Sequence, residues 1–258
     1  MLASRAVKLE RLSEDWNELA EEDALWAVLA EPGKQGGRWD VEEFLATGER
    51  EVAGVLATAE QLGLPRERAR ALDFGCGVGR LTRALSAHFA ECIGVDISSE
   101  MVERARKLNG DRPNCEFVVN VAPDLSRFEN ASFDFVYSSK VLQHLPSGKL
   151  ACEYVSEFLR VVRAGGLVVF QLWTHIPLRN RLQPRRRAYG VLRVLRLPQR
   201  FLNRLGLTPM GRGIAVPEAE IRRAIEHADG EVIHTEPDGE WGLRYFATPT
   251  RSSTAASS

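Results

Sequence analysis

The sequence has 258 residues, of which 44% are hydrophobic and 27% are charged, and its formal net charge is −1. This composition is typical of a globular protein with one sizeable core. The longest apolar run, near 165–173, is far too short to span a bilayer, and residues 1–16 lack the apolar stretch of a signal peptide. We therefore expect one cytoplasmic domain over residues 1–250 and a disordered tail over 251–258.

Two helical stretches are expected first, at roughly 13–30 and 40–62, forming an N-terminal helical cap over residues 1–62. From residue 69 onward, short β-branched runs alternate with helical periodicity. This pattern is typical of a parallel sheet covered by helices on both faces.

Five strands are expected at 69–74, 91–97, 115–121, 132–138 and 167–173. Between them, apolar spacing predicts helices near 81–89, 99–108 and 150–162. Ser98 is placed to cap the second of these helices, and Gly165 and Gly166 are expected to stop the third. A helix at 217–228 and strands near 230–236 and 241–248 follow.

The cysteines give no indication of a metal site or of disulfides. Cys76, Cys92, Cys115 and Cys152 show neither C-x-x-C spacing nor a nearby histidine cluster. We expect four reduced thiols and no bound metal.

The stretch ALDFGCGVGR, residues 71–80, places three glycines on alternate positions directly after the first strand. Such a turn brings backbone N–H groups close to a ligand, and an acid that ends the second strand can then bind a ribose diol. This logic fits dinucleotides and S-adenosylmethionine alike. The G-x-G-x-G spacing argues against NAD(P), because Arg80 occupies the position of the third dinucleotide glycine.

Three further segments follow this loop in order: GVDIS at 94–98, SFDFVYSSKVLQHLP at 132–146 and EFLRVVRAGGLVVFQL at 157–172. With them, the sequence resembles the class I S-adenosylmethionine-dependent methyltransferases, especially the methyltransferase type 11 group, over about residues 40–175. The resemblance implies a doubly wound, Rossmann-like sheet of seven strands, mostly parallel with an antiparallel last strand. It also implies an enzyme whose cofactor is S-adenosyl-L-methionine.

The resemblance assigns roles to residues of the matching motifs. Asp73 would hold the amino-acid end of the cofactor, directly or through water, while Asp96 would take both ribose hydroxyls and Ile97 would pack on the adenine. In place of the acid that many members offer to the adenine amino group, this chain has Asn120 and Val121. The implied cofactor-binding residues are Asp73, Gly75, Cys76, Gly77, Asp96, Ile97, Met101, Asn120, Val121, Ala122 and Ser138.

Two histidines follow strands at the edge where open α/β sheets bind ligands: His144 after the fourth strand and His175 after the fifth. Either could act as the catalytic base, since histidine titrates near neutrality. In the family, a histidine at the position of His144 often shapes the cofactor pocket instead. Transfer without any protein base also remains open.

The segment after the fourth strand lacks several signatures of other family branches, and their absence narrows the range of possible methyl acceptors. Residues 138–141 read SSKV, without the Asn/Asp-Pro-Pro-Tyr/Phe signature, the Pro-Cys nucleophile or the metal-binding acids of other family branches. We expect O-methylation of a small molecule or glycan, and no nucleic acid partner. The alternative is a non-catalytic protein that binds S-adenosylmethionine and offers a basic interaction surface.

Residues 176–216 hold ten arginines and no Asp or Glu. We expect a helical insert that forms a lid over the acceptor pocket, with Pro198 dividing its helices. The alternative is docking of residues 185–204 on an anionic membrane, or on a lipid-linked acceptor. Ahead of the sheet, Trp39 fits either a cap on the cofactor pocket or a core position.

Overall fold

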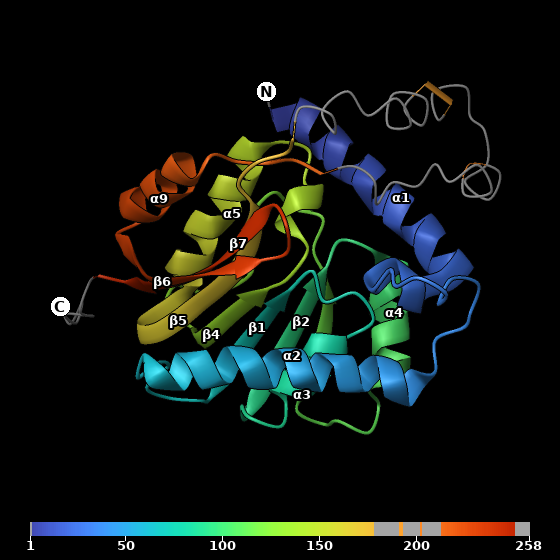
Figure 1. Cartoon of the computed structure of the whole chain (residues 1–258), viewed down its shortest axis with the longest axis horizontal. Helices are drawn as coiled ribbons and strands as arrows, with labels where there is room; N and C mark the ends of the chain where they lie inside the picture. Colours follow the sequence, from blue (N-terminus) through green and yellow to red (C-terminus); the bar gives the residue numbers. More distant parts are fainter. Residues whose placement is uncertain (1, 178–190, 193–201, 203–212, 251–258) are drawn as a thin grey trace.

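A mixed sheet of seven strands, in the order β3-β2-β1-β4-β5-β7-β6, organises the chain (Figure 1). The computed structural model describes residues 2–177, 191–192, 202 and 213–250. The strands are β1 (Arg70–Phe74), β2 (Glu91–Asp96), β3 (Cys115–Val119), β4 (Phe133–Ser138), β5 (Val162–Trp173), β6 (Gly230–Asp238) and β7 (Gly242–Pro249).

Strands β1 to β5 pair in parallel, whereas β7 runs antiparallel to both β5 and β6. The predicted doubly wound sheet with an antiparallel last strand is therefore confirmed. Strand β1 lies between β2 and β4, so the order of the strands reverses there. Open α/β sheets bind ligands in the crevice at the carboxyl ends of the strands beside such a reversal.

Helices cover both faces of the sheet (Figure 1). On one face lie α2 (Val41–Gln61) and α3 (Arg80–Leu85), and on the other lie α5 (Gly148–Val161) and α9 (Glu218–His227). Successive side chains of β1 point to opposite faces of the sheet and so enter the hydrophobic cores on both faces. Leu72 packs with α5, and Ala71 packs with α2. Helix α4 (Ser99–Leu108) packs on β2 and β3, capped by Ser98 as predicted.

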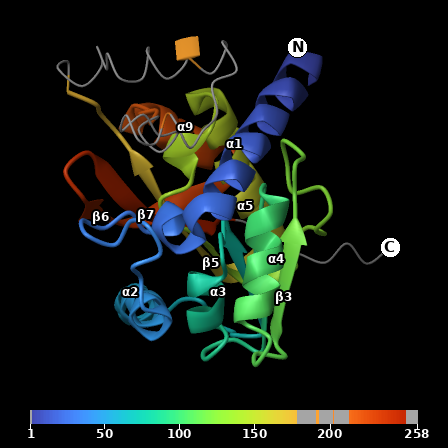
Figure 2. The same cartoon turned by 90° about the vertical axis from the view of Figure 1, so that its right-hand side faces the viewer.

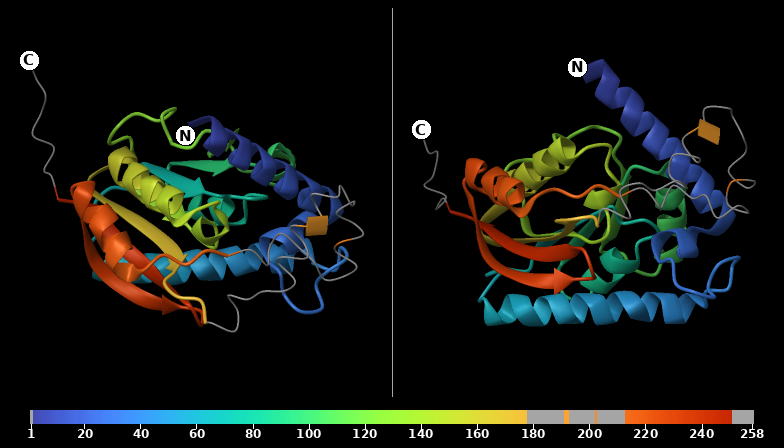
Figure 3. Two further views of the ribbon diagram at one scale, coloured as in Figure 1. Left: turned by 90° about the horizontal axis from the view of Figure 1, so that it is seen from above. Right: turned by 45° about the horizontal axis from the view of Figure 1, so that its top comes forward.

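The first helix, α1 (Leu2–Val28), lies across the carboxyl ends of the strands (Figures 2 and 3). It begins much earlier than the predicted start near residue 13, and its backbone leaves the helical conformation at Asp23. Polar contacts attach it beside β2: the Ser13 hydroxyl donates to the carbonyl of Ile97, and Asn17 Oδ1 accepts from the Ser98 hydroxyl. This helix therefore covers the edge where the glycine loop lies.

Two predicted boundaries are wrong. Helix α5 ends at Val161, not at Gly165 and Gly166, because Val162 already pairs with Phe133 as the first residue of β5. Gly165, with φ of 77°, instead lies in the irregular start of β5. Helix α3 ends at Leu85, which leaves the exposed His88 in a turn after the helix.

The predicted helices of the basic insert lie outside the described residues. From Gly213 the chain is described again and packs directly against the end of β5, with the Val216 amide 2.9 Å from the Trp173 carbonyl. The Ile214 amide donates to the carbonyl of Gln143 in the one-turn helix η1 (Leu142–His144). Among the described helices, none combines the length and the apolar character that crossing a membrane requires.

Candidate functional site

The glycine loop between β1 and α3 forms the floor of the candidate site. Gly75 and Gly77 have φ of 78° and 53°, values that favour glycine. A Cβ on Gly75 would lie 2.2 Å from a methyl group of Val141, and one on Gly77 would lie 2.5 Å from a methyl group of Val28. The backbone of the loop therefore approaches its neighbours more closely than any side chain would allow.

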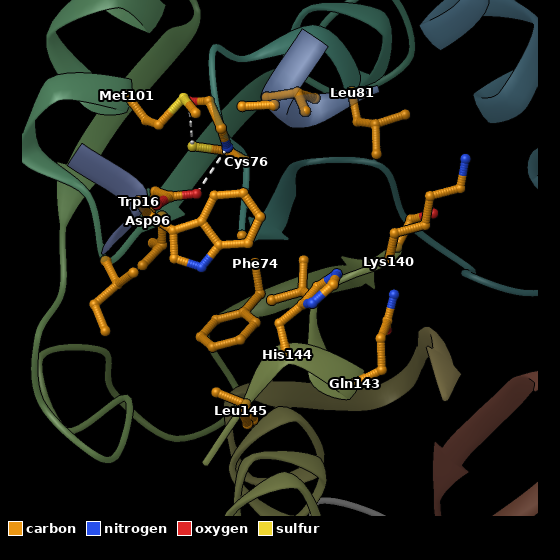
Figure 4. A pocket seen from close by; sticks show the side chains of 18 of the residues that line it. Trp16, Phe74, Cys76, Leu81, Asp96, Met101, Lys140, Gln143, His144 and Leu145 are labelled. Atoms are coloured by element: carbon orange, nitrogen blue, oxygen red, sulfur yellow. Dashed lines mark hydrogen bonds between the residues drawn. The ribbon is translucent and has the colours of Figure 1, made fainter. Parts of the chain in front are cut away.

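A cavity of about 350 Å³ opens above this loop. Its size lies within the range of small-molecule sites, about 300–1,000 Å³. On one side lie Cys76, Asp96 and Met101, and across from them lie His144 and Leu145 (Figure 4). The wall combines α1 and the loop after it, the glycine loop, parts of α3, α4 and α5, the segments after β2, β3 and β4, and the end of β5. Most of its side chains are apolar.

Asp96 ends β2 at the cavity wall. Its Oδ2 accepts a hydrogen bond of 2.8 Å from the Gly77 amide, and its Oδ1 accepts one of 2.8 Å from the Ser98 amide. Burial raises the pKa of the carboxyl, while backbone hydrogen bonds from Ser98, Gly77 and Ile97 counteract that rise. A carboxylate offers about four lone-pair sites, so Asp96 can still accept a hydrogen bond from a ligand.

Asp73 lies behind the wall rather than in it. Its side chain is 1% exposed, and its Oδ2 accepts a 2.6 Å hydrogen bond from the Thr82 hydroxyl while Oδ1 has no hydrogen-bond partner. Burial raises its pKa to about 7, against the opposing effects of Thr82 and Arg80. An unpartnered buried carboxylate oxygen directly beneath a ligand loop is a costly feature.

The structure brings together most, but not all, of the residues expected to bind the cofactor. Seven of them line the cavity, namely Gly75, Cys76, Gly77, Asp96, Ile97, Met101 and Asn120. Val121 points outward with 51% exposure, and the carbonyl of Ala122 accepts the Tyr154 hydroxyl. Ser138 is fully buried at the end of β4 and does not line the cavity. Its neighbour Ser139 does line it.

Of the two candidate catalytic histidines, only His144 lines the cavity. It belongs to η1, and its ring meets that of Trp16 from α1 edge to face, with centroids 5.5 Å apart. His175 is exposed beyond the end of β5 and lies outside the cavity. Its expected catalytic role has no support from its position.

Sequence reasoning missed Trp16, since no motif marks a wall residue on an amphipathic helix. It also did not decide whether Trp39 caps the pocket or lies in the core. Trp39 is 6% exposed, donates its indole N–H to the Leu29 carbonyl, packs on Phe44 and does not line the cavity. It is a core residue.

A buried ion pair that the motifs did not reveal lies beside the loop. Arg80, 3% exposed, donates from Nη2 to Glu51 Oε2 of α2 over 2.8 Å. The other oxygen of Glu51 accepts from the hydroxyls of Ser139, at 2.6 Å, and of Tyr137, at 2.9 Å. Burial acts to raise the pKa of Glu51, but the charge and hydrogen bond of Arg80, the Ser139 hydroxyl and the Lys140 charge hold it below its usual range.

Burial gives Asp73 a testable pH signature. An aspartate in an unfolded chain ionises near pH 4, about three units below the pKa of about 7 that Asp73 has in the fold. Between these values the folded chain keeps a proton that the unfolded chain has lost. Stability that Asp73 contributes at low pH is therefore lost as the pH rises toward 7.

Asp73→Asn removes this titration and keeps an oxygen for Thr82. The free energy of unfolding of the wild type, relative to this variant, should fall by up to about 4 kcal/mol between about pH 4 and about pH 7. Urea unfolding across that range measures it. Asp111→Asn is the control, because Arg83 lowers the pKa of this exposed carboxyl and its contribution cannot fall as the pH rises. A difference between wild type and Asp73→Asn that is constant with pH would contradict the burial account.

Residues 72–170 match a family model described as a methyltransferase domain. Over 110 residues the chain is 34% identical to the tocopherol O-methyltransferase of Arabidopsis thaliana, an alignment that covers 41% of this chain and 30% of that protein. Over 103 residues it is 36% identical to the 2-methyl-6-phytyl-1,4-hydroquinone methyltransferase of Synechocystis, covering 40% of this chain and 31% of that protein. The chain thus spans less than a third of the length of these curated relatives.

Among solved structures, the magnesium protoporphyrin IX methyltransferase of Synechocystis PCC 6803 with bound S-adenosylhomocysteine has the same fold. Its TM-score is 0.60 at 19% identity, with 94% of this chain and 99% of that chain covered. Such a likeness shows the fold alone, and it agrees with the match to the methyltransferase family. The resemblance drawn from the motifs is confirmed: the chain carries a class I S-adenosylmethionine-dependent methyltransferase domain.

Proposed function

We propose that the chain transfers a methyl group from S-adenosyl-L-methionine to a small molecule with a largely apolar surface. The observation that carries this proposal is the position of Asp96 in the cavity wall. Its two oxygens are oriented by the amides of Gly77 and Ser98 at the cavity wall. The two oxygens of one carboxylate match the two neighbouring hydroxyls of a ribose.

The other residues of this side of the cavity fit the same cofactor. The positive φ of Gly75 and Gly77 keeps the floor free of side chains. Ile97 and Met101 provide apolar surface for an adenine ring, and Asn120 lines the wall near them. The unpartnered Oδ1 of Asp73 beneath the loop suits a cationic amino-acid end, reached through a water molecule.

When bound, the cofactor supplies an electrophilic methyl group: its bond to sulfur breaks and leaves the electron pair on sulfur, a bond to the acceptor forms, and a hydroxyl acceptor loses its proton. The chain must then orient the acceptor, exclude water and receive that proton. His144 is the residue that we assign to the proton, because its ring lines the cavity across from Asp96 (Figure 4). Trp16 holds the ring in place by edge-to-face packing.

The acceptor side of the cavity favours an apolar small molecule over a glycan. Its wall contains Leu12, Trp16, Leu145 and Trp173, whereas a glycan requires many hydrogen-bonding partners. The names of the two curated relatives, a tocopherol and a phytyl-hydroquinone methyltransferase, point to acceptors of the same character. Oxygen as the methylated atom, and docking of 185–204 on a membrane or a lipid-linked acceptor, remain predictions.

Replacing Asp96 with Ala tests the cofactor site. Two charge-assisted hydrogen bonds of about 1.5–3 kcal/mol each would disappear, so the affinity for S-adenosylhomocysteine should fall at least about tenfold in calorimetry. Glu103→Ala is the matched control, because its exposed carboxylate on α4 pairs with the neighbouring Lys107 and does not line the cavity. A folded Asp96→Ala variant with wild-type affinity would refute the ribose assignment.

The proton role of His144 predicts a separation between turnover and cofactor binding. With an acceptor identified by the mass gain of one CH₂ group, His144→Ala should lower kcat by about 10² or more and leave S-adenosylhomocysteine affinity near wild type. His88→Ala provides the control, since this histidine is exposed in the turn after α3. Loss of cofactor affinity in His144→Ala would mean that His144 is a wall residue. Cofactor binding without a methylated product from any acceptor would favour the non-catalytic alternative.

A further inference from the structure

Glu51 lies in α2, outside the segment that matches the methyltransferase family, yet it joins two parts of the cavity wall. Its Oε2 accepts from Arg80 at the start of α3, and its Oε1 accepts from Ser139 directly after β4. Arg80 and Ser139 both line the cavity, and each is more than nine-tenths buried. A single carboxylate therefore fixes one cationic and one hydroxyl group of the site.

The hydrogen bond to Glu51 determines what the Ser139 hydroxyl can offer. A serine hydroxyl has one hydrogen to donate and two lone pairs. Because its hydrogen is directed at Glu51 Oε1 over 2.6 Å, only lone pairs remain for a ligand. Ser139 thus presents a hydrogen-bond acceptor to the cavity.

The surrounding charges have both signs. Arg80 and Lys140 line the same cavity as Ser139, and the unpartnered Oδ1 of Asp73 lies beneath the loop beside them. In the sheet, Asp73 is level with Tyr137, which places Gly75 and Ser139 at the same edge. A ligand group at this edge must satisfy positive and negative neighbours together, as a zwitterionic amino-acid group does.

We propose that the Ser139 hydroxyl binds the ammonium group at the amino-acid end of S-adenosylmethionine, and that Glu51 is the positioning residue that orients it. This inference rests on the proposed function, because it takes S-adenosylmethionine as the ligand. Ser139 replaces Ser138, which the sequence assigned and which is buried away from the cavity. The role of α2 is then to extend the cofactor site beyond the family's motif segment.

Comparing the affinities for two ligands distinguishes a contact with the amino-acid end from a general disturbance of the structure. S-adenosylhomocysteine carries the amino-acid end, whereas 5′-methylthioadenosine has the same nucleoside and sulfur without it. Ser139→Ala should lower the calorimetric affinity for S-adenosylhomocysteine about tenfold or more and leave that for methylthioadenosine unchanged. Tyr137→Phe is the control, because it removes the other hydroxyl that donates to Glu51 Oε1 at a residue that does not line the cavity. This variant should bind both ligands as the wild type does.

Glu51→Gln should lower the affinity for S-adenosylhomocysteine more than the affinity for methylthioadenosine. Because it leaves Arg80 buried without its counter-charge, it can prevent folding, and the Ser139 and Tyr137 pair then carries the test. Equal losses for the two ligands in Ser139→Ala, or no loss for either, would overturn the inference while leaving the proposed function intact. A wild-type chain that binds neither ligand would overturn both.

Discussion

The site depends on one carboxylate at the end of a central strand. Asp96 accepts hydrogen bonds from the amide of Gly77 in the glycine loop and from the amide of Ser98 at the cap of α4. It thereby connects β2, the turn that follows β1 and the start of the next helix. The strand reversal beside β1 opens this edge of the sheet, and Asp96 holds in place the backbone that a ligand would meet there.

Around this edge, segments distant in sequence complete the cavity. Helix α1 contributes Trp16, which packs against His144, and α2 contributes Glu51, which holds Arg80 and Ser139. The motif segment supplies the glycine loop and Asp96, and the N-terminal helices supply much of what surrounds them. The cavity is mainly apolar, with Asp96 and Arg80 beside the glycine loop, and this composition suits a polar cofactor and an apolar acceptor.

Local patterns in the sequence predicted the succession of strands and helices, and the family resemblance implied the seven-stranded sheet with its antiparallel last strand. Alternating apolar runs, a glycine loop and a Ser98 cap are readable residue by residue. The positions of Ser138 and His175 outside the cavity depend on geometry across the sheet. Whether Ser138 or Ser139 reaches the cavity depends on the exact end of β4, and His175 lies outside because of the direction in which the chain leaves β5.

The parts of the cavity wall that α1 and α2 contribute could not be predicted for the same reason. Periodicity identifies an amphipathic helix, but it does not say that Glu51 of α2 will meet Arg80 of α3 and two hydroxyls near the end of β4. The helix α2 approaches α3 closely at Gly48, where a Cβ would lie 2.7 Å from the carbonyl oxygen of Arg80. Such long-range contacts carry no local signal and become evident only in the assembled fold.

A crystal structure of the chain with S-adenosylhomocysteine bound tests the account most directly. The account predicts the ligand in the cavity above the glycine loop, with both ribose hydroxyls hydrogen-bonded to Asp96 and its sulfur directed toward the side lined by His144. A ligand bound elsewhere on the chain, or a ribose without contact to Asp96, would contradict it.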